Sequence, residues 1–369
     1  MAMTLDGSNG VTFNDSSLQG AAASPYGLKN RIINGDMRID QRNAGASVTP
    51  TSAQYGLDRW KMSAPVASKY SFQQNAGSVT PPVGFANYLG ITSLSAYSVA
   101  STDVFATFQY IEGYNIADLG WGTANAKTVT LSFWVRSSLT GTFGGCLGNG
   151  NATRSYPFTY TISSANTWEQ KTVTIAGDTS GTWLTTTSIG IGLYLGFGVG
   201  STYSGTAGAW AGAEYYGATG ATSVVGTNGA TFYITGVQLE VGSTATPFER
   251  RMYGQELALC QRYCQRWTGN GVSTQVAIAI GFQVATTDSL FNVQTAVPMR
   301  SAPTITFSSL IVSDSVSYDA AVSVVGLANW SSTSTYTGAT HASAGSAGKP
   351  VRISPGASST GFLNFSAEL

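Results

Sequence analysis

A two-residue alternation of apolar and polar side chains within short runs is the feature that most constrains what this chain can fold into. In the clearest run, residues 128–135 (TVTLSFWV), Val, Leu, Phe and Val alternate with Thr, Ser and Trp. Successive side chains of a strand point to opposite faces, so this run predicts a sheet with one buried face. Gly, Asn and Ser clusters separate similar runs, which predicts a β-sandwich or jelly roll. Those runs lie at residues 105–111, 156–162, 169–175, 188–195 and 231–239.

A single segment departs from this pattern. Residues 246–249 (TPFE) have the order of a helix start, with Thr at the N-cap, Pro at the first helical position and Glu three residues after the cap. The apolar residues that follow are spaced 4, 3, 4 and 3 apart, as on one face of a two-heptad helix. This seam predicts either association between copies of the chain or packing of the helix on its own sheet. Its residues are Tyr253, Leu257, Cys260, Cys264 and Trp267.

The β pattern returns after Gly269 and Gly271 and continues to the C-terminus. Within it, residues 331–349 are nearly all Ser, Thr, Gly and Ala, so we expect a loop there, at the tip of the molecule. We therefore predict an all-β chain in four parts. These are an N-terminal arm (1–29), a jelly-roll β-sandwich (30–245), a short linking α-helix (246–268) and a second, smaller C-terminal β-sandwich (269–369).

The charge composition excludes several classes of partner. Charged residues make up only 10% of the chain, and 18 Lys and Arg balance 18 Asp and Glu. Such a chain offers no basic surface for nucleic acid. No apolar run approaches the roughly 18 residues needed to span a bilayer, so we expect no membrane insertion. The first residues, MAMTLDGSNG, lack the basic start and apolar centre of a signal peptide, which predicts synthesis in a cytosol.

Residues for catalysis are scarce. The chain has one histidine, three cysteines and none of the common hydrolase, nucleotide-binding or zinc motifs. We therefore predict no enzymatic activity. Paired carboxylates remain an alternative, because glycan hydrolases use two of them at a fixed separation. The acids available for such a pair are Asp103, Glu112, Asp118, Glu169, Asp178 and Glu214.

Several short motifs, taken in order, resemble a domain common in phage tail fibre and minor tail proteins. Residues 30–37 (NRIINGDM), with Gln41-Arg42 and 57–60 (LDRW), resemble its beginning, and residues 232–242 (FYITGVQLEVG) resemble its final strand. The junction that follows also matches, at residues 247–251 (PFERR) and 256–263 (ELALCQRY), and so does the ending 362–369. The resemblance implies a rigid, trimeric virion tail subunit that is made in the host cytoplasm and contacts the host surface. The N-terminal arm would then join it to other virion tail proteins.

The first and last strands of this domain are also similar to galactose-binding-like jelly rolls, as in carbohydrate-binding modules. Such modules often hold a structural calcium ion, and the matching oxygens here are those of Asp36, Asp40 and Glu240. The usual acidic pair of the final strand is replaced by Thr235-Gly236, and Ca²⁺ needs six or more oxygen ligands. No other cofactor is expected.

The expected ligand is a host surface polysaccharide or lipopolysaccharide. Sugar rings present flat CH faces to aromatic rings, and amphipathic Tyr and Trp suit them. Rings in glycine-rich stretches are therefore receptor-binding candidates, although packing between subunits would place them there as well. The candidates are Tyr203, Trp210, Tyr215 and Tyr216 in the first domain and Trp330, Tyr336 and His341 in the second.

Three functions thus remain open. The first is a receptor-binding tail fibre without catalysis. The second is a capsid-attached head fibre or decoration protein, because residues 1–29 carry no motif that separates tail from head attachment. The third is a tailspike-type glycan depolymerase that uses a carboxylate pair.

Overall fold

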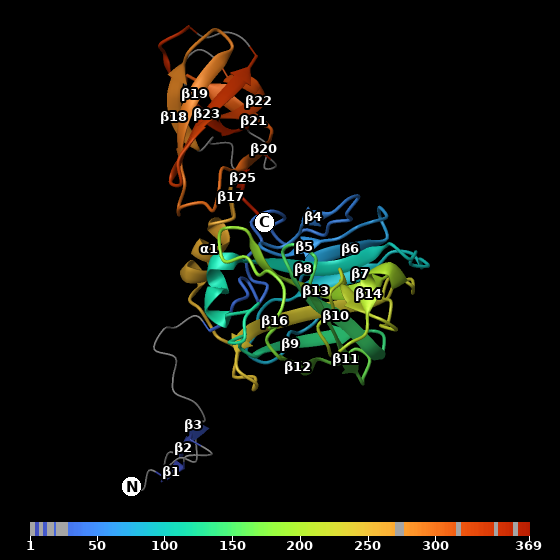
Figure 1. Cartoon of the computed structure of the whole chain (residues 1–369). Coiled ribbons are helices and arrows are strands. Elements are labelled where there is room, and N and C mark those ends of the chain that lie inside the picture. Colours follow the sequence, from blue (N-terminus) through green and yellow to red (C-terminus); the bar gives the residue numbers. More distant parts are fainter. Residues whose placement is uncertain are drawn as a thin grey trace.

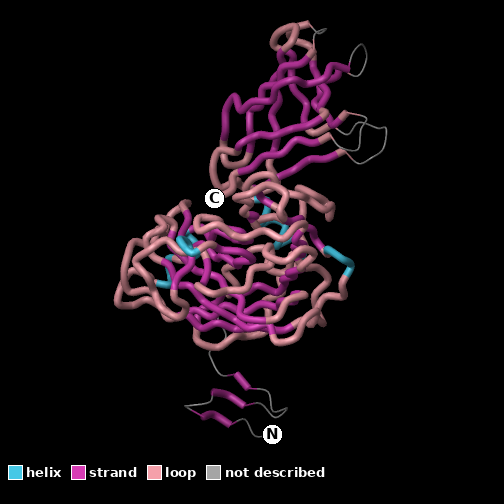
Figure 2. Tube along the Cα trace, turned by 90° about the vertical axis from the view of Figure 1, so that its right-hand side faces the viewer, coloured by secondary structure: helices cyan, strands magenta, loops and turns pink. Residues whose placement is uncertain are grey.

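The computed structural model of the chain describes residues 4–6, 10–12, 18–19, 29–269, 277–314, 319–342, 346–356 and 361–369. A large β-sandwich and a smaller barrel are joined at a narrow region that holds the α-helix and the C-terminus (Figure 1). Seen from the side, the barrel stands over one edge of the sandwich (Figure 2). The chain is all-β apart from this helix and four short 3-10 turns within the described residues.

The sandwich consists of two antiparallel sheets. The strands of the first sheet are β4 (Gln54–Tyr55), β5 (Lys61–Met62), β8 (Val104–Glu112), β10 (Gly141–Asn149), β11 (Ser155–Ile162) and β13 (Ile189–Val199). Those of the second are β6 (Tyr70–Gln74), β7 (Leu89–Ser93), β9 (Val129–Ser137), β12 (Glu169–Ile175) and β16 (Thr231–Val241). The spatial orders are β11-β10-β13-β8-β5-β4 and β12-β9-β16-β7-β6. Most neighbours are not consecutive in the chain, as in a jelly roll.

The alternating runs form the strands that they predict. In β9, Val129, Leu131, Phe133 and Val135 are all buried in the core between the sheets. The strand lies between β12 and β16 and is paired with both, with a register shift in the pairing with β16 between Thr235 and Gln238. Strand β10 is different, because its sequence GTFGGCLGN reads as a turn, yet it forms a nine-residue central strand between β11 and β13. Its small residues are accommodated by the bulky side chains of the strands beside it.

Short elements complete the sandwich. They are the 3-10 turns η1 (Ala76–Ser78), η2 (Gly113–Asn115), η3 (Ala117–Leu119) and η4 (Ser201–Tyr203), and the parallel pair β14 (Ser204–Gly205) and β15 (Gly217–Ala218). The pair belongs to the glycine-rich loop that follows β13. At the N-terminus, β1 (Thr4–Asp6), β2 (Gly10–Thr12) and β3 (Leu18–Gln19) form a small antiparallel sheet. Most of the predicted arm lies outside the described residues, and its role in attachment stays a prediction.

The predicted helix is shorter than expected and its heptad seam is not formed. Helix α1 spans only Tyr253–Gln261, while Cys264 and Trp267 belong to strand β17 (Cys264–Thr268). Long-range pairing with β25 (Phe362–Ser366) outweighs the local helical spacing. Trp267 instead packs edge-on against Phe365, with the ring centroids 5.1 Å apart.

The predicted helix start is wrong as well. Thr246 bonds to Glu240 through both its backbone N–H (2.8 Å) and its hydroxyl (2.6 Å). Glu249 accepts from the backbone N–H groups of Lys29 and Asn30, each at 3.0 Å. These polar side chains therefore close the sandwich by fastening its first and last segments together.

Helix α1 packs on its own chain. Cys260 is fully buried with Ile33, Ile39 and Tyr263, and Leu257 lies half-buried beside them. Tyr253 points outward, with 58% of its surface exposed. The interpretation in which the helix packs on its own domain is the one that the structure shows, and association between copies stays a prediction.

The C-terminal part is all-β, but its strands close into a barrel instead of the predicted sandwich. The barrel order is β18-β19-β23-β22-β21-β24, and β17, β25 and β20 form a separate three-stranded sheet at its base. Residues 331–349 were expected to be a loop, but the stretch Ser334–His341 forms β23, because every second side chain of this Ser/Thr-rich strand faces the barrel interior. The strands not yet defined are β18 (Ala279–Gln283), β19 (Asp288–Gln294), β20 (Thr304–Ser308), β21 (Leu310–Ser313), β22 (Asp319–Trp330), β23 (Ser334–His341) and β24 (Pro350–Pro355).

Buried charges fix the barrel base to the sandwich. The Arg59 guanidinium donates to the carboxylate of Glu368, next to the C-terminal residue, and lies 3.5 Å from the centroid of the Tyr263 ring. Arg42 donates to the other oxygen of Glu368 at 2.9 Å. Arg262 forms a bidentate ion pair with Glu112 of β8, at 3.0 and 2.7 Å. The side chains bring residues more than 300 positions apart into one network.

Asp58 lies at the centre of this network and generates a pH-dependent prediction. Burial raises its pKa to about 6, against the lowering effect of Arg42 and of hydrogen bonds from Gln41. Because this pKa exceeds the value of 3.8 expected without burial, the folded chain holds a proton that the unfolded chain releases between about pH 4 and 6. Its contribution to stability is therefore greatest at low pH and is lost as the pH rises through 6.

We expect the Asp58→Asn variant to lose this dependence. The free energy of unfolding of the variant, relative to that of the unmodified chain, should rise by on the order of 2 kcal/mol between pH 4 and pH 7. Urea unfolding at four pH values measures it, with Asp118→Asn, whose carboxylate is half exposed, as the control substitution. A relative stability that stays flat or falls with pH would contradict the assignment.

Candidate functional site

The outer face of the six-stranded sheet carries an aromatic cluster. Phe108 and Tyr110 of β8 and Tyr194 of β13 point away from the sandwich core, because they alternate with core residues along their strands. Phe108 and Tyr194 stack with centroids 5.1 Å apart, and the Tyr110 and Tyr194 hydroxyls lie 3.4 Å apart. Such a set of rings on the outside of a sheet is a platform for a ligand or for a covering segment.

The glycine-rich loop after β13 covers part of this platform. Tyr216 packs on Tyr194 at 4.7 Å and on Tyr203 at 5.4 Å, between ring centroids. Its backbone N–H donates to the carbonyl of Tyr203 at 2.8 Å. The β14–β15 pair holds the two ends of the loop together, and Tyr215 rests on Gly205 of β14, where a Cβ would clash with its ring.

The loop leaves a hollow beside the platform. It encloses about 400 Å³, part of it open solvent. Four of the side chains that line it are tyrosines. The lining rings and carboxylate are those of Tyr110, Tyr194, Tyr215, Tyr216 and Glu214.

Gly148 lines the hollow, and Gly192 lies next to it on the neighbouring strand. Gly148 of β10 and Gly192 of β13 are paired across the sheet, and Gly192 is paired in turn with Tyr110. A Cβ at Gly192 would lie 2.8 Å from the Tyr194 ring, so no side chain fits there without displacing the tyrosine. A Cβ at Gly148 would make an ordinary contact, 3.4 Å from the carbonyl oxygen of Arg154.

The polar groups of the hollow are held in defined states. Burial raises the pKa of Tyr194 well above its usual value, and burial together with a hydrogen bond to Glu214 raises the pKa of Tyr216. Both hydroxyls stay protonated at physiological pH, and both donate within the cluster, Tyr216 to Glu214 and Tyr194 to the Tyr110 hydroxyl. Arg154 also lines the hollow and is fixed by two hydrogen bonds to the buried Asp178, at 2.7 and 2.8 Å.

Among the predicted receptor residues of this domain, Trp210 has a different place. It packs against Trp121 and Trp183, with centroids 5.3 and 5.4 Å apart, and its indole N–H donates to the Ala176 carbonyl at 2.7 Å. These contacts make it a structural ring that anchors the loop. Tyr203 supports Tyr216 but does not line the hollow.

The receptor-binding candidates of the C-terminal domain lie on opposite sides of the barrel wall. His341 is buried, with its Nε2 2.9 Å from the Ser289 hydroxyl and its Nδ1 3.1 Å from the Ala342 carbonyl, so it is not available to a surface ligand. Trp330 and Tyr336 lie outside and line a second hollow together. His341 was misplaced because the surrounding Ser/Thr-rich residues were expected to form a loop.

The predicted calcium ligands do not come together. Asp36 pairs with Arg38 at 3.1 Å, and Asp40 accepts from the backbone of Asn43 and Gly45 in its own turn. Glu240 is occupied by Thr246 and Gln238. In the part of the chain that the structure describes, no three acidic, histidine or cysteine residues are grouped as a metal site requires.

The acids considered for a catalytic pair are also separated and engaged. Asp103 accepts from Tyr97, and Asp118 pairs with Arg31. Glu169 pairs with Lys171. Of the six, only Glu214 lines the tyrosine hollow, and its carboxylate accepts from Tyr216. Glu112 and Asp178 are bound to Arg262 and Arg154, as described above.

Tyr110 and Tyr194 are site residues that the sequence did not single out. Each lies in a predicted strand at a position opposite in phase to the core residues, which is the signal that could have found them. An aromatic residue at an outward position is common on any sheet, so the signal becomes specific only once the strands are paired.

No protein-family model matches the sequence, and no curated protein matches it. Similar solved structures include a family 11 carbohydrate-binding module from Clostridium thermocellum in complex with a β-1,3-1,4-mixed-linked tetrasaccharide. It is 12% identical, with a TM-score of 0.28 over 53% of this chain and 97% of the module. A family 4 carbohydrate-binding module is 16% identical, with a TM-score of 0.27 over 57% and 98% of the two chains.

The enzymatically active domain of tailspike protein 4 from bacteriophage CBA120 is 10% identical, with a TM-score of 0.30. The match covers 60% of this chain and 22% of the tailspike. At such identities and TM-scores, these likenesses establish nothing about what this chain binds.

None of the helices within the described residues is long and apolar enough to span a bilayer.

The different space around Gly148 and Gly192 leads to a prediction about the packing of the site. We expect Gly192→Ala to push the Tyr194 ring off Phe108 and to destabilise the chain by about 1–3 kcal/mol, as overpacking does. Gly148→Ala is the matched control, because its new methyl group has room and should change stability by less than about 0.5 kcal/mol. Urea unfolding of both variants measures the difference, and equal effects would contradict the close packing of the Tyr194 ring on Gly192.

Proposed function

We propose that this chain is a non-catalytic structural subunit of a phage tail, a fibre or receptor-binding protein that attaches the virion to a glycan of the host surface. The observation that carries the proposal is the convergence of four tyrosines and the Glu214 carboxylate on an open hollow in the outer face of the jelly roll. Rings provide flat apolar faces for sugar CH groups, and hydroxyls and carboxylate provide hydrogen bonds for sugar hydroxyls.

The rigidity of the hollow supports binding. Tyr110 and Tyr194 extend from central strands, while Tyr216 is fixed by its ring contacts and its bond to Glu214. Because these side chains are already ordered, a ligand does not have to immobilise them, and less of its binding energy is lost to entropy.

The absence of catalysis is supported by the state of the acids. A glycosidase needs two carboxylates on either side of the bond that it cleaves, about 5–10 Å apart. The tyrosine hollow has one, Glu214, because Asp178 is turned away and fully engaged with Arg154. The site can therefore hold a sugar but lacks an acid–base pair.

The assignment to a tail rests on the sequence motifs. Residues of these motifs, among them Asp58, Arg59, Glu256, Arg262 and Glu368, build the junction between sandwich and barrel. In the proposed assembly, three chains associate at the exposed side of α1, the N-terminal arm joins other virion tail proteins, and the barrel points away from that attachment. Attachment to the capsid is the second candidate.

Glycan binding is tested with the full-length chain on a microarray of bacterial surface polysaccharides, followed by calorimetry on the glycan that binds best. We expect Tyr110→Ala to raise the dissociation constant about tenfold, because a stacking ring contributes on the order of 1 kcal/mol. Tyr114→Ala is the control, since Tyr114 is an exposed tyrosine (62%) of the same domain that lies outside the hollow.

Two results would contradict the proposal. One is binding that Tyr110→Ala leaves unchanged, or no binding at all. The other is release of new reducing ends from the bound polysaccharide, which would indicate a depolymerase.

The assembly is tested by analytical ultracentrifugation and by imaging of the particle. We expect a mass of three chains, and a smaller species when the exposed Met252 and Tyr253 of α1 are both changed to Asp. A monomer at micromolar concentration would contradict the trimer, and density on the capsid in cryo-electron microscopy would favour a head fibre over a tail fibre.

A further inference from the structure

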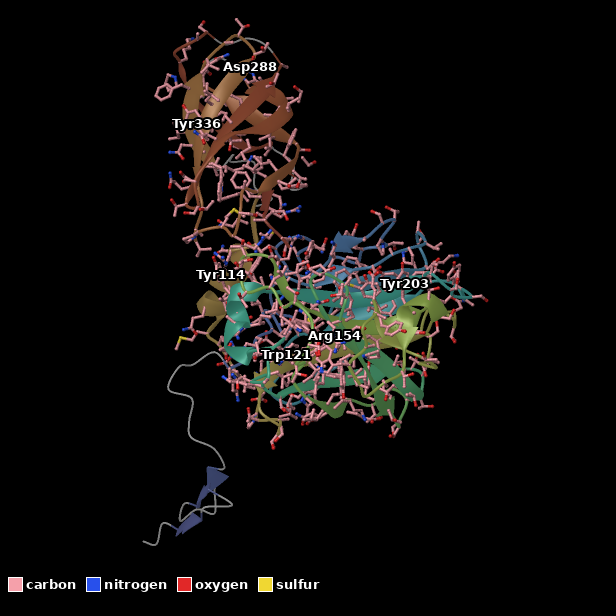
Figure 3. The ribbon with its side chains drawn as sticks, in the orientation of Figure 1. Tyr114, Trp121, Arg154, Tyr203, Asp288 and Tyr336 are labelled. Carbon is pink, nitrogen blue, oxygen red and sulfur yellow. The ribbon has the colours of Figure 1, made fainter. Side chains whose placement is uncertain are left out.

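The barrel carries a second hollow on its outer surface, remote in the chain from the tyrosine hollow. It lies where the hairpin of β22 and β23 meets β19, and it encloses about 450 Å³ including open solvent. Figure 3 places Tyr336 on the outside of the barrel, on a different body from Tyr203 and Arg154. Its lining residues are Asn292, Asn329, Trp330, Ser331, Ser334 and Tyr336.

Strand register brings three of these side chains into one row. Tyr336 of β23 is paired with Asn292 of β19 on one side and with Asn329 of β22 on the other. The neighbours Phe291 and Val293 are buried in the barrel, so Asn292 faces outward, and Tyr336 is 45% exposed. The register of β22 shifts between Leu327 and Asn329, and such a bulge re-aims the side chains that follow it. An aromatic ring therefore stands between two amides.

The turn that closes the hollow is tied down. The Ser331 hydroxyl accepts from the backbone N–H of Ser334 at 3.1 Å, and the two hydroxyls are 3.0 Å apart. The turn also receives hydrogen bonds from the backbone of Thr295 and Met299, at 3.1 and 2.8 Å. The hollow is thus largely formed before any ligand arrives, which favours binding.

The hollow has hydrogen-bonding capacity to spare. Asn292 uses its carbonyl oxygen to accept from Gln294, and Asn329 uses its own to accept from the backbone of Trp330. Neither amide N–H₂ has an acceptor among the described residues. The Trp330 indole N–H is shielded and also lacks an acceptor there, which is unfavourable for a buried donor.

The chemistry of the lining selects a class of ligand. No charged side chain lines the hollow, so nothing compensates an acidic or basic group that loses its water there. Two amide donors, two serine hydroxyls and a tyrosine beside a tryptophan match the hydroxyls and CH faces of a sugar. We propose that the barrel holds a second glycan site, specific for neutral saccharides and independent of the tyrosine hollow.

The proposed barrel site is tested by monitoring the Trp330 side chain by fluorine NMR. The full chain is labelled with 5-fluorotryptophan, and the fluorine resonance of Trp330 is assigned by its loss in Trp330→Phe. The probes are maltohexaose, cellohexaose and chitotetraose as neutral saccharides and a galacturonate hexamer as the acidic one. We expect at least one neutral probe to shift the Trp330 resonance and the acidic probe to leave it unmoved.

The matched variants separate the two sites. Tyr336→Ala should raise the apparent dissociation constant of the neutral probe about tenfold or more. Tyr110→Ala and Tyr114→Ala should leave this constant unchanged. The shift of Trp330 in the Tyr110→Ala chain shows whether the barrel binds even when the tyrosine hollow does not.

Three outcomes would overturn the second site. In the first, no neutral probe shifts the Trp330 resonance. In the second, the acidic hexamer shifts it equally. In the third, Tyr336→Ala changes the mass of the assembly in ultracentrifugation and leaves probe binding intact, which would make this face an interface between copies of the chain.

Discussion

The buried ion pair between Arg59 and Glu368 is the interaction on which the arrangement of the two bodies depends. It joins the beginning of the sandwich to the last residues of the chain, and Arg42, Asp58 and Tyr263 surround it. Loss of one partner from a buried pair typically costs about 3–5 kcal/mol, because the other charge is left without compensation. Arg300 adds three bonds to the carbonyls of Ala367, Glu368 and Thr187. The barrel is therefore fixed at its base.

The motifs that resemble tail proteins converge on this junction and not on either hollow. Their residues bind the first segment, the helix and the last strand to one another, so they specify an architecture. The hollows are built from residues outside these motifs, such as Tyr110, Glu214 and Tyr336. The junction and the two hollows are therefore built from different sets of residues.

The sequence predicted the sandwich strands well because a buried face imposes a period of two, as in β9. It failed where local and long-range preferences disagree. Cys264 and Trp267 have helical spacing, but pairing with β25 recruits them to a strand. The glycine-rich β10 has no pattern of its own, since its place is set by the strands on either side. For the site, Tyr215, Tyr216, Trp330 and Tyr336 were predicted, while Tyr110 and Tyr194 emerge only when strand pairing shows which rings share a face.

The central claim is that the tyrosine hollow of the jelly roll binds a glycan. A crystal structure of the full chain with the oligosaccharide that binds best tests it most directly. We expect a sugar ring against Tyr110 and Tyr216, with a sugar hydroxyl that donates a hydrogen bond to the Glu214 carboxylate. Sugar density found on the five-stranded sheet instead, with the tyrosine hollow filled only by water, would contradict it.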